Sequence, residues 1–226
     1  MPPREPRRTR TGPPGPDLQH ERPFLAEGAM VAGIDEVGRG AWAGPLTIGA
    51  VVLDPDAVPA GLRDSKRLTA PRRSAIAEVI AAQAIVGIGE VAVPELDRIG
   101  LAAALRVAAA RAVAALPVRP DVVLVDGTVD LLAGTGLTTR CLVGGDDRSA
   151  SIAAASIAAK VHRDEGMVAA DDRFPAYAFA RHKGYPSPAH RAALAEHGPC
   201  ALHRHSWRPI QALSGRQPAL FASPTG

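Results

Sequence analysis

Acidic residues end two short apolar segments of the sequence, where they could support chemistry that needs a metal ion. The segment VAGID ends on Asp35 and the segment VVLVD ends on Asp126, and each aspartate leads into a turn that contains glycine. In open α/β sheets, ligands gather outside the carboxyl ends of neighbouring strands. If the two segments are parallel neighbours in one sheet, Asp35 and Asp126 converge on one spot.

Two further acidic positions could join this pair. Glu36 follows Asp35 directly, but adjacent side chains of a regular strand point to opposite faces, so Glu36 can join only if the strand ends or kinks there. A third carboxylate comes from Asp146 or Asp147, just before a long Ala-rich segment. Crowded carboxylates need a counter-charge, and oxygen ligands select hard cations such as Mg²⁺ or Mn²⁺. Taken singly, each acid is more typical of a turn than of a ligand, and only the group favours a metal site.

Glycines and basic residues near the acids could contact a phosphate backbone. Gly38 and Gly40 let the chain approach a ligand closely, and Arg39 between them could contact phosphate, although a tight turn explains this run equally well. The spacing fits neither a P-loop nor a dinucleotide fingerprint. Ser65 and Lys66 precede a predicted helix and could hold a phosphate, with an exposed loop as the equal alternative.

One of only two tyrosines lies in a basic loop with glycine and proline. The run RHKGYP places Tyr185 beside Lys183, and stacking on a sugar or base explains this tyrosine better than a place in the core does. Each lysine is informative because only three of the 26 basic residues are lysines, namely Lys66, Lys160 and Lys183.

Two other groups of charged residues have simpler interpretations. His203, Arg204 and His205 lie near Trp207 and predict a solvated surface patch. The neighbours Arg163 and Asp164 lie in the predicted long helix and could form an intrahelical ion pair or support a site from behind.

The elements that must position these residues follow from the apolar patterns. Strands are expected at 29–35, 46–53, 84–93, 121–126 and 137–143. Helices are expected at 71–83 (with Thr69 as N-cap), 101–116, 151–170 and 189–197. Because the strands cluster first and then alternate with helices, the pattern predicts an α/β sheet of mixed direction.

Composition bounds the class of protein. The chain has 226 residues with 46% hydrophobic content, which suits one domain with a packed core. We expect an Arg/Pro-rich disordered tail at 1–28, one folded domain at 29–213 and a flexible tail at 214–226. No apolar run is long enough for a membrane span, and no secretory signal precedes the domain. Two cysteines, Cys141 and Cys200, predict reduced thiols and a cytoplasmic location. The charge of +3 is compatible with a polyanionic partner but does not indicate one by itself.

Five motifs, in their order along 29–210, resemble those of bacterial type 2 ribonuclease H, the ribonuclease HII family. They are GIDEVGRG at 33–40 with GP at 44–45, DSK at 64–66, VDG at 125–127, GD at 145–146 with IAAASI at 152–157 and AKV at 159–161, and HKGY at 182–185 with His190 and EHG at 196–198. Any one alone is weak evidence, whereas the ordered set is specific.

The resemblance implies an RNase H-like fold: a five-stranded mixed β-sheet flanked by helices, with a C-terminal helical extension. It implies that two Mn²⁺ or Mg²⁺ ions bind the catalytic carboxylates, which fall on Asp35, Glu36, Asp126 and Asp146. The glycine loop and Tyr185 would sense a ribose 2′-hydroxyl. The predicted substrate-binding set is Gly38, Arg39, Gly40, Ser65, Lys66, Lys183 and Tyr185.

The implied activity is that of an endoribonuclease acting on two partners, RNA–DNA hybrids and DNA duplexes that contain ribonucleotides. It would cut 5′ to an embedded ribonucleotide, leave 5′-phosphate and 3′-hydroxyl ends, and serve in ribonucleotide and RNA-primer removal. We expect a monomer.

Two alternatives remain open. A ribonuclease HIII would carry a folded N-terminal substrate-binding extension and lack the G-R-G loop. A catalytically silent nucleic-acid-binding module would not need four acids, because carboxylates repel phosphate. If Asp126 or Asp146 lay far from Asp35, the nuclease interpretation would be wrong.

Overall fold

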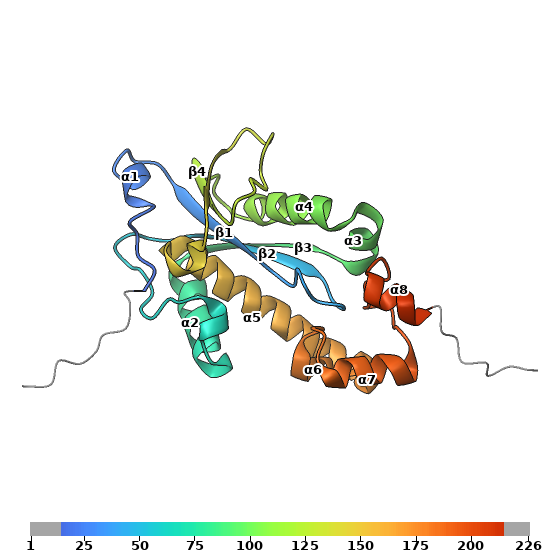
Figure 1. Ribbon diagram of the computed structural model, residues 1–226. Helices are drawn as coiled ribbons and strands as arrows, with labels where there is room; N and C mark the ends of the chain where they lie inside the picture. The colour runs from blue at the N-terminus through green and yellow to red at the C-terminus, as the bar shows by residue number, and fades with distance from the viewer. Residues whose placement is uncertain (1–14, 215–226) are drawn as a thin grey trace, which may run out of the picture.

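A five-stranded mixed sheet forms the centre of the computed structural model, which describes residues 15–214 (Figure 1). The strands are β1 (Val31–Val37), β2 (Leu46–Val52), β3 (Ile85–Val91), β4 (Val122–Asp126) and β5 (Thr138–Leu142). Their spatial order is β3-β2-β1-β4-β5. The first three strands are antiparallel, and β4 runs parallel to both β1 and β5. The predicted mixed sheet is confirmed.

Helices cover both faces of this sheet. Figure 1 shows α4 on one face and α2 with α5 on the other, while three short helices follow α5 toward the C-terminus. The bounds are α2 (Ala70–Gln83), α3 (Val93–Ile99), α4 (Leu101–Ala114), α5 (Ala150–Arg173), α6 (Phe179–His182), α7 (Pro188–His197) and α8 (Arg208–Ser214). The short helices α3, α6 and α8 were not predicted because four to seven residues display little periodicity. No helix within residues 15–214 has the length and apolar character needed to cross a bilayer.

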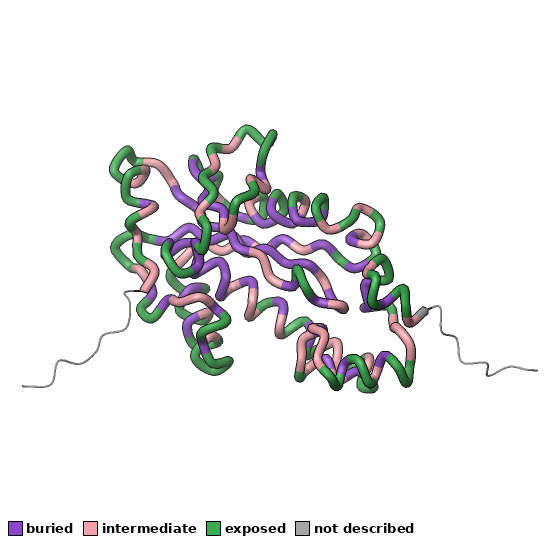
Figure 2. The backbone as a smooth tube through the Cα atoms, in the orientation of Figure 1, coloured by how far each residue is buried: buried purple, intermediate pink, exposed green. Residues whose placement is uncertain are grey.

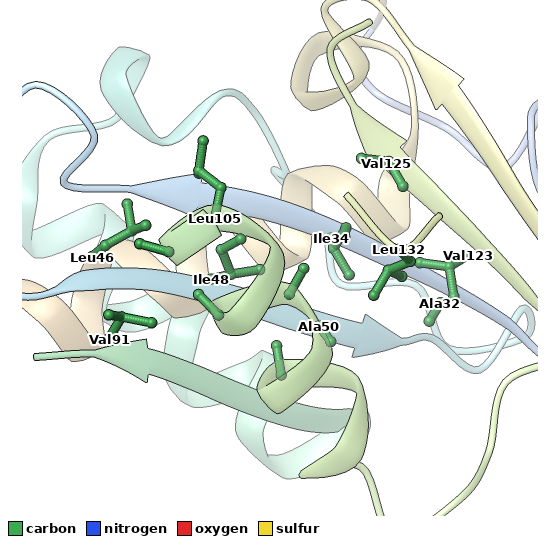
Figure 3. Close-up of a cluster of buried hydrophobic side chains, with 14 of the residues drawn as sticks. Ala32, Ile34, Leu46, Ile48, Ala50, Val91, Leu105, Val123, Val125 and Leu132 are labelled. Atoms are coloured by element: carbon green, nitrogen blue, oxygen red, sulfur yellow. The ribbon is translucent and has the colours of Figure 1, made fainter. Parts of the chain in front are cut away.

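Small residues let the helices approach the sheet closely. A Cβ atom on Gly33 of β1 would lie 2.3 Å from the backbone of α5, and one on Gly89 of β3 would lie 2.1 Å from the Ala108 carbonyl oxygen of α4. The core between the sheet and α4 therefore consists of aliphatic side chains on the strands against Leu105 and several alanines of the helix. Figure 3 shows Leu105 above the strand side chains of this cluster. Figure 2 shows the buried positions following the strands and the inner sides of the two long helices.

Alternation along β1 decides which face each acidic residue meets. Ala32 and Ile34 pack in the core that contains α4, whereas Gly33 faces α5. Two-residue periodicity then directs Asp35 toward α5 and Glu36 toward the α4 face.

The N-terminal segment differs from the predicted tail. Residues 1–14 lie outside the described residues, but 15–28 are packed and include α1 (Arg22–Leu25). Glu21 is buried, and its Oε1 accepts hydrogen bonds from Ser149 Oγ (2.6 Å), Ser151 N (3.0 Å) and Ser151 Oγ (2.7 Å). The prediction was wrong here because Glu21 accepts a free N–H at the start of α5 and lies at the positive end of that helix, which composition does not reveal. Of the predicted C-terminal tail, residue 214 ends α8, and 215–226 lie outside the described residues.

We expect Glu21→Ala to lower the free energy of unfolding by about 2 kcal/mol, since it removes a charged acceptor from three buried donors. Urea denaturation measures the change. Glu27→Ala, an exposed acid of the same segment, is the matched control and should stay within about 0.5 kcal/mol of the unmodified chain. Equal stability of the two variants would contradict a structural role for the segment.

Candidate functional site

Three aspartates, Asp35, Asp126 and Asp146, lie near one another at one end of the sheet. In the parallel pair β1–β4, Ile34 lies opposite Val125, so Asp35 and Asp126 lie at the same level on neighbouring strands. Asp126 ends β4, whereas β1 continues past Asp35 to Val37, beyond the strand end predicted from the sequence. Asp126 Oδ1 accepts a hydrogen bond from the Gly145 N–H at 2.7 Å. That bond brings in the short 3₁₀ turn of residues Gly145–Asp147, which carries Asp146.

Glu36 reaches this region differently from the prediction. Strand β1 neither ends nor kinks at Glu36 but continues to Val37. Glu36 therefore lies at the border of two clefts: it lines one of about 440 Å³ together with Asp35, and one of about 410 Å³ together with Asp126. As they stand, no three acidic, histidine or cysteine side chains within residues 15–214 form a group able to hold a metal ion.

The acids nevertheless share one electrostatic environment. Burial raises the pKa of Asp35 to about 8, and the nearby carboxylates of Glu36, Asp126 and Asp146 add to the effect. Burial also raises the pKa of Glu36, against the opposing effect of Arg39, and it raises the pKa of Asp146, with Asp126 adding to it. These carboxyl groups therefore need a nearby positive charge if all of them are to be ionised together. An all-oxygen donor set with this need for positive charge fits a hard divalent cation.

Two basic side chains offset part of that charge. Lys66 Nζ lies 3.6 Å from Asp146 Oδ2 and 3.8 Å from Asp64 Oδ1. Burial alone would lower the pKa of Lys66, but the surrounding carboxylates raise it overall. On the other side, Arg39 Nη1 lies 3.4 Å from Glu36 Oε1. Both cations stand at the rim, where they can also meet a phosphate.

The cleft of about 440 Å³ collects most of the predicted substrate-binding set. Its lining residues are Asp35, Glu36, Val37, Gly38, Arg39, Gly40, Ser65, Lys66, Ser156, Lys160 and Tyr185. Ser156 and Lys160 were missing from the prediction. Ser156 Oγ donates a hydrogen bond to Ser65 Oγ at 2.9 Å. The rarity of lysine had marked Lys160 as informative without giving it a role, and two of the three lysines line this cleft.

Lys183 does not join the cleft. Its backbone adopts a left-handed conformation (φ +53°), and its Nζ turns back to donate a hydrogen bond to the Ala180 carbonyl oxygen of α6. The sequence neighbour Tyr185 faces the acids, whereas Lys183 lines a separate hollow beside α5.

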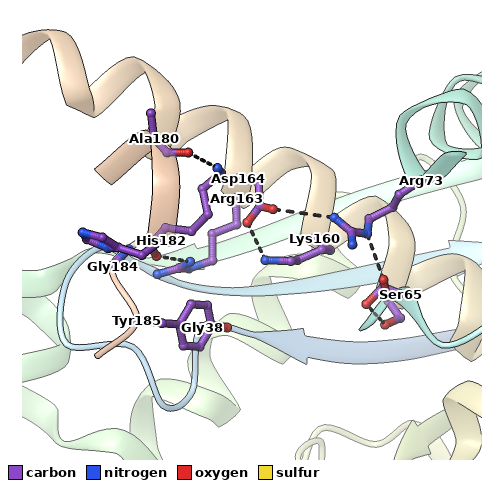
Figure 4. Close-up of polar contacts among 12 residues, drawn as sticks. Gly38, Ser65, Arg73, Lys160, Arg163, Asp164, Ala180, His182, Gly184 and Tyr185 are labelled. Carbon is purple, nitrogen blue, oxygen red and sulfur yellow. Dashed lines mark hydrogen bonds and ion pairs between the residues drawn. The ribbon is translucent and has the colours of Figure 1, made fainter. Parts of the chain in front are cut away.

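Tyr185 is joined to the glycine loop by its hydroxyl group. The Gly38 N–H donates a hydrogen bond to Tyr185 Oη at 3.2 Å. Figure 4 shows the ring beside Gly38 and below α5, and its centroid lies 5.5 Å from both Lys160 Nζ and Arg163 Cζ. The ring therefore lies near two cations of α5, in the lining of the cleft.

The predicted surface patch of histidines is wrong for His203 and Arg204, which are fully buried. The Cys200 N–H donates to His203 Nδ1 at 2.9 Å, so the proton of His203 is on Nε2. That Nε2–H donates to His190 Nε2 (2.9 Å), and the Nδ1–H of His190 donates to the Tyr185 carbonyl oxygen (2.9 Å). Burial lowers the pKa of both rings, that of His203 to about 4, so the chain of bonds stays neutral and holds the Tyr185 backbone.

The alternatives for Arg163 and Asp164 are also resolved. Asp164 Oδ1 accepts a hydrogen bond from Lys160 Nζ at 2.6 Å, and its Oδ2 lies 3.8 Å from Arg73 Nη1. Arg163 turns away from its neighbour toward the glycine loop, so the pair forms no intrahelical ion pair (Figure 4).

Comparison with known proteins points to one family. Residues 32–210 match the family model described as Ribonuclease HII. A protein named Ribonuclease HII from Sinorhizobium medicae (strain WSM419) is 48% identical over 202 residues, which cover 89% of this chain and 93% of the relative. Another of that name, from Moorella thermoacetica, is 51% identical over 190 residues, 83% of this chain and 91% of the relative.

Solved structures show the same likeness. The crystal structure of the ribonuclease H2 from Pyrococcus horikoshii OT3 has a TM-score of 0.73 at 26% identity, covering 82% of this chain and 97% of that one. RNase HII in its complex with PCNA from Archaeoglobus fulgidus has a TM-score of 0.69 at 28% identity, covering 84% and 98%. Bst-RNase HIII in complex with Mn²⁺ has a TM-score of 0.64 at 19% identity, covering 83% and 70%, and shares the fold.

Proposed function

The chain belongs to the ribonuclease HII family of endoribonucleases, and on this premise we propose that it hydrolyses the RNA strand of RNA–DNA hybrids and cuts 5′ to ribonucleotides embedded in duplex DNA. One observation carries the proposal: Asp35 and Asp126 lie at the same level on parallel neighbouring strands, beside a cleft lined by the glycine loop and Tyr185. The cleft therefore offers a place for a scissile phosphate between acidic and basic side chains.

Asp35, Glu36, Asp126 and Asp146 would hold two divalent cations, Mg²⁺ or Mn²⁺. When bound, such ions activate a water molecule for in-line attack and neutralise charge on the phosphate and the leaving 3′-oxygen. The side chains of Lys66 and Arg39 would attract the substrate phosphates to the rim of the cleft. Products with 5′-phosphate and 3′-hydroxyl ends require no covalent intermediate with the protein. The Mn²⁺ in the Bst-RNase HIII structure supports this choice of ions.

The glycine loop and Tyr185 would read the sugar. The 2′-hydroxyl is the group by which a protein distinguishes RNA from DNA. Backbone groups of 38–40 and the ring of Tyr185 both line the cleft, next to the acids. The Gly38–Tyr185 hydrogen bond couples these two readers, so that a ribonucleotide can be placed against both at once.

A cleavage assay on a DNA duplex with one embedded ribonucleotide tests the proposal. We expect a single cut on the 5′ side of the ribonucleotide, only with Mg²⁺ or Mn²⁺, and loss of the cut with a chelator. Cleavage of a continuous hybrid alone would favour a ribonuclease HIII-type activity. Binding of the duplex without any cut would favour the silent binding module.

Tyr185→Ala should lower kcat/KM at a single embedded ribonucleotide by about 10- to 100-fold, because stacking of a base on an aromatic ring contributes roughly 1–3 kcal/mol. The loss on a continuous RNA–DNA hybrid should be smaller. Tyr185→Phe keeps the ring but removes the acceptor for the Gly38 N–H. Its kcat/KM at the single ribonucleotide should therefore lie between the values for the unmodified chain and for Tyr185→Ala. Unchanged cleavage of the single-ribonucleotide duplex by Tyr185→Ala would refute the sensing role.

In the cell, this activity would serve to remove ribonucleotides from DNA and RNA primers from new strands. The monomeric state and the cytoplasmic location stay predictions from the sequence.

A further inference from the structure

Two buried arginines hold the glycine loop by its carbonyl groups. Arg163 of α5 is 1% exposed and Arg204 is 0% exposed. Arg163 Nε donates to the Pro45 carbonyl oxygen (2.9 Å) and Nη2 to that of Ala43 (3.0 Å), while Nη1 donates to that of Lys183 (3.0 Å). The long helix is thereby tied to the loop and to the segment that carries the sensing tyrosine.

Arg204 approaches the same loop from the C-terminal segment. Its Nε and Nη2 donate to the Gly44 carbonyl oxygen at 3.1 and 3.0 Å, and Nη2 also donates to that of Pro45 at 3.1 Å. Its Nη1 donates to the carbonyl oxygen of Arg39, between the two glycines of the motif, at 3.2 Å. Within residues 15–214, every hydrogen bond from the two guanidinium groups ends on a backbone carbonyl, and none ends on a carboxylate.

The loop is shaped to receive these side chains. Gly38 and Gly44 both have a positive φ, +86° and +84°. A Cβ on Gly38 would lie 2.4 Å from Arg163 Nε, and one on Gly44 would lie 3.1 Å from Arg163 Nη2. Two like charges are nevertheless buried together, and burial with the charge of Arg163 lowers the pKa of Arg204 to about 10. Burying two like charges lowers the stability of the fold, so we expect the two arginines to contribute to function.

Peptide geometry shows what the loop gains. The Arg39 carbonyl and the Gly40 N–H belong to one trans peptide unit, so they point in opposite directions. By holding that carbonyl inward, Arg204 turns the Gly40 N–H outward, and Gly40 lines the cleft. Within the described chain, the N–H groups of Arg39 and Gly40 donate no hydrogen bond, whereas those of Gly38 and 41–44 all do.

We propose that Arg204 is a positioning residue that aims the Gly40 N–H at the 2′-hydroxyl oxygen of the substrate ribose, with Arg163 fixing the rest of the loop. This inference rests on the proposed function and assigns its specificity to a side chain that never touches the nucleic acid. Discrimination of ribose from deoxyribose then depends on how firmly one peptide plane is held.

Arg204→Lys tests the inference, because an ammonium group cannot bridge the carbonyls of Arg39, Gly44 and Pro45 together. Two duplexes are compared, one all-DNA and one with a single ribonucleotide. We expect kcat/KM at the ribonucleotide to fall by about tenfold or more, and the preference in Kd for the ribonucleotide duplex to disappear. The Kd for all-DNA duplex and the shift in Tm caused by Mn²⁺ should stay unchanged.

Arg208→Lys, an exposed arginine four residues along, is the matched control and should behave as the unmodified chain. Unchanged discrimination by Arg204→Lys would overturn the inference. So would weaker binding of both duplexes together with a lost Mn²⁺ response, since that pattern indicates general damage to the fold.

A second pair of variants addresses the donor directly and does not depend on the stability of Arg204→Lys. Gly40→Pro removes the N–H, whereas Gly40→Ala keeps it, and an added Cβ there meets no atom within 4 Å. The proline variant should lose at least about tenfold more of the preference than the alanine variant. Equal losses would overturn the inference. An unmodified chain that neither prefers nor cuts the ribonucleotide duplex would overturn the proposed function itself.

Discussion

Asp126→Asn is expected to lower the cleavage rate by about 10²- to 10³-fold or more while the fold stays intact. Asparagine keeps an oxygen that can accept the Gly145 N–H at the place of Asp126 Oδ1, so the turn that carries Asp146 should stay in position. What disappears is one negative charge of the group proposed to hold divalent cations. Single-turnover cleavage of the ribonucleotide duplex, with Mn²⁺ binding followed by calorimetry, measures both consequences.

The same strand offers a matched control. Asp121 precedes β4 at its other end, and its carboxylate likewise accepts a backbone N–H, that of Met30, at 2.8 Å. Asp121→Asn should therefore cleave at the unmodified rate, even if it costs some stability. Retained turnover in Asp126→Asn would remove Asp126 from the cation site, whatever the stability of the variant.

Asp35→Asn should abolish cleavage and yet stabilise the cation-free protein at alkaline pH. Burial raises the folded-state pKa of Asp35 to about 8, against an ordinary value of 3.8. The unfolded chain thus releases this proton near pH 4 while the folded chain retains it, so the contribution to stability is full below about pH 4 and is lost as pH rises toward about 8. Each unit of difference corresponds to about 1.4 kcal/mol, so the loss is on the order of a few kcal/mol.

Urea denaturation with a chelator at about pH 5 and about pH 8 checks this expectation. The asparagine variant should exceed the unmodified chain in stability by on the order of 2–5 kcal/mol at the higher pH, and the gain should shrink at the lower pH. Mn²⁺ should raise the Tm of the unmodified chain but not that of the variant. A variant less stable than the unmodified chain at the higher pH would contradict the destabilising effect of ionising the buried Asp35 carboxylate.

The sequence predicted those features that depend on short-range pattern. Apolar runs ending on Asp35 and Asp126 marked two strands, and the parallel pairing of β1 with β4 places the two aspartates at the same level, although β1 continues to Val37. Asp146 was chosen over Asp147 from the resemblance, and the hydrogen bond that holds its turn beside Asp126 comes from the preceding Gly145 N–H. In each case, the position of a residue within its own element determined where the side chain would lie.

The features that the sequence did not predict depend on partners far along the chain. Arg204 is buried because it meets carbonyl groups about 160 residues away, and nothing local distinguishes it from a surface arginine. Glu21 is buried for the same kind of reason, since its donors lie at the start of α5. Lys183 was misplaced because a left-handed backbone turned it away from Tyr185, and the motif does not display that conformation.

The position of Arg204 late in the chain has a consequence for biosynthesis. All four acids have been synthesised once the chain reaches residue 146, but the side chain that orients the loop between β1 and β2 is added only 58 residues later. Since chains begin to fold from the N-terminus during synthesis, the acids proposed to hold the cations can come together before the residue proposed to distinguish ribose from deoxyribose has been made. A chain released prematurely after α5 would carry the acids without that selectivity.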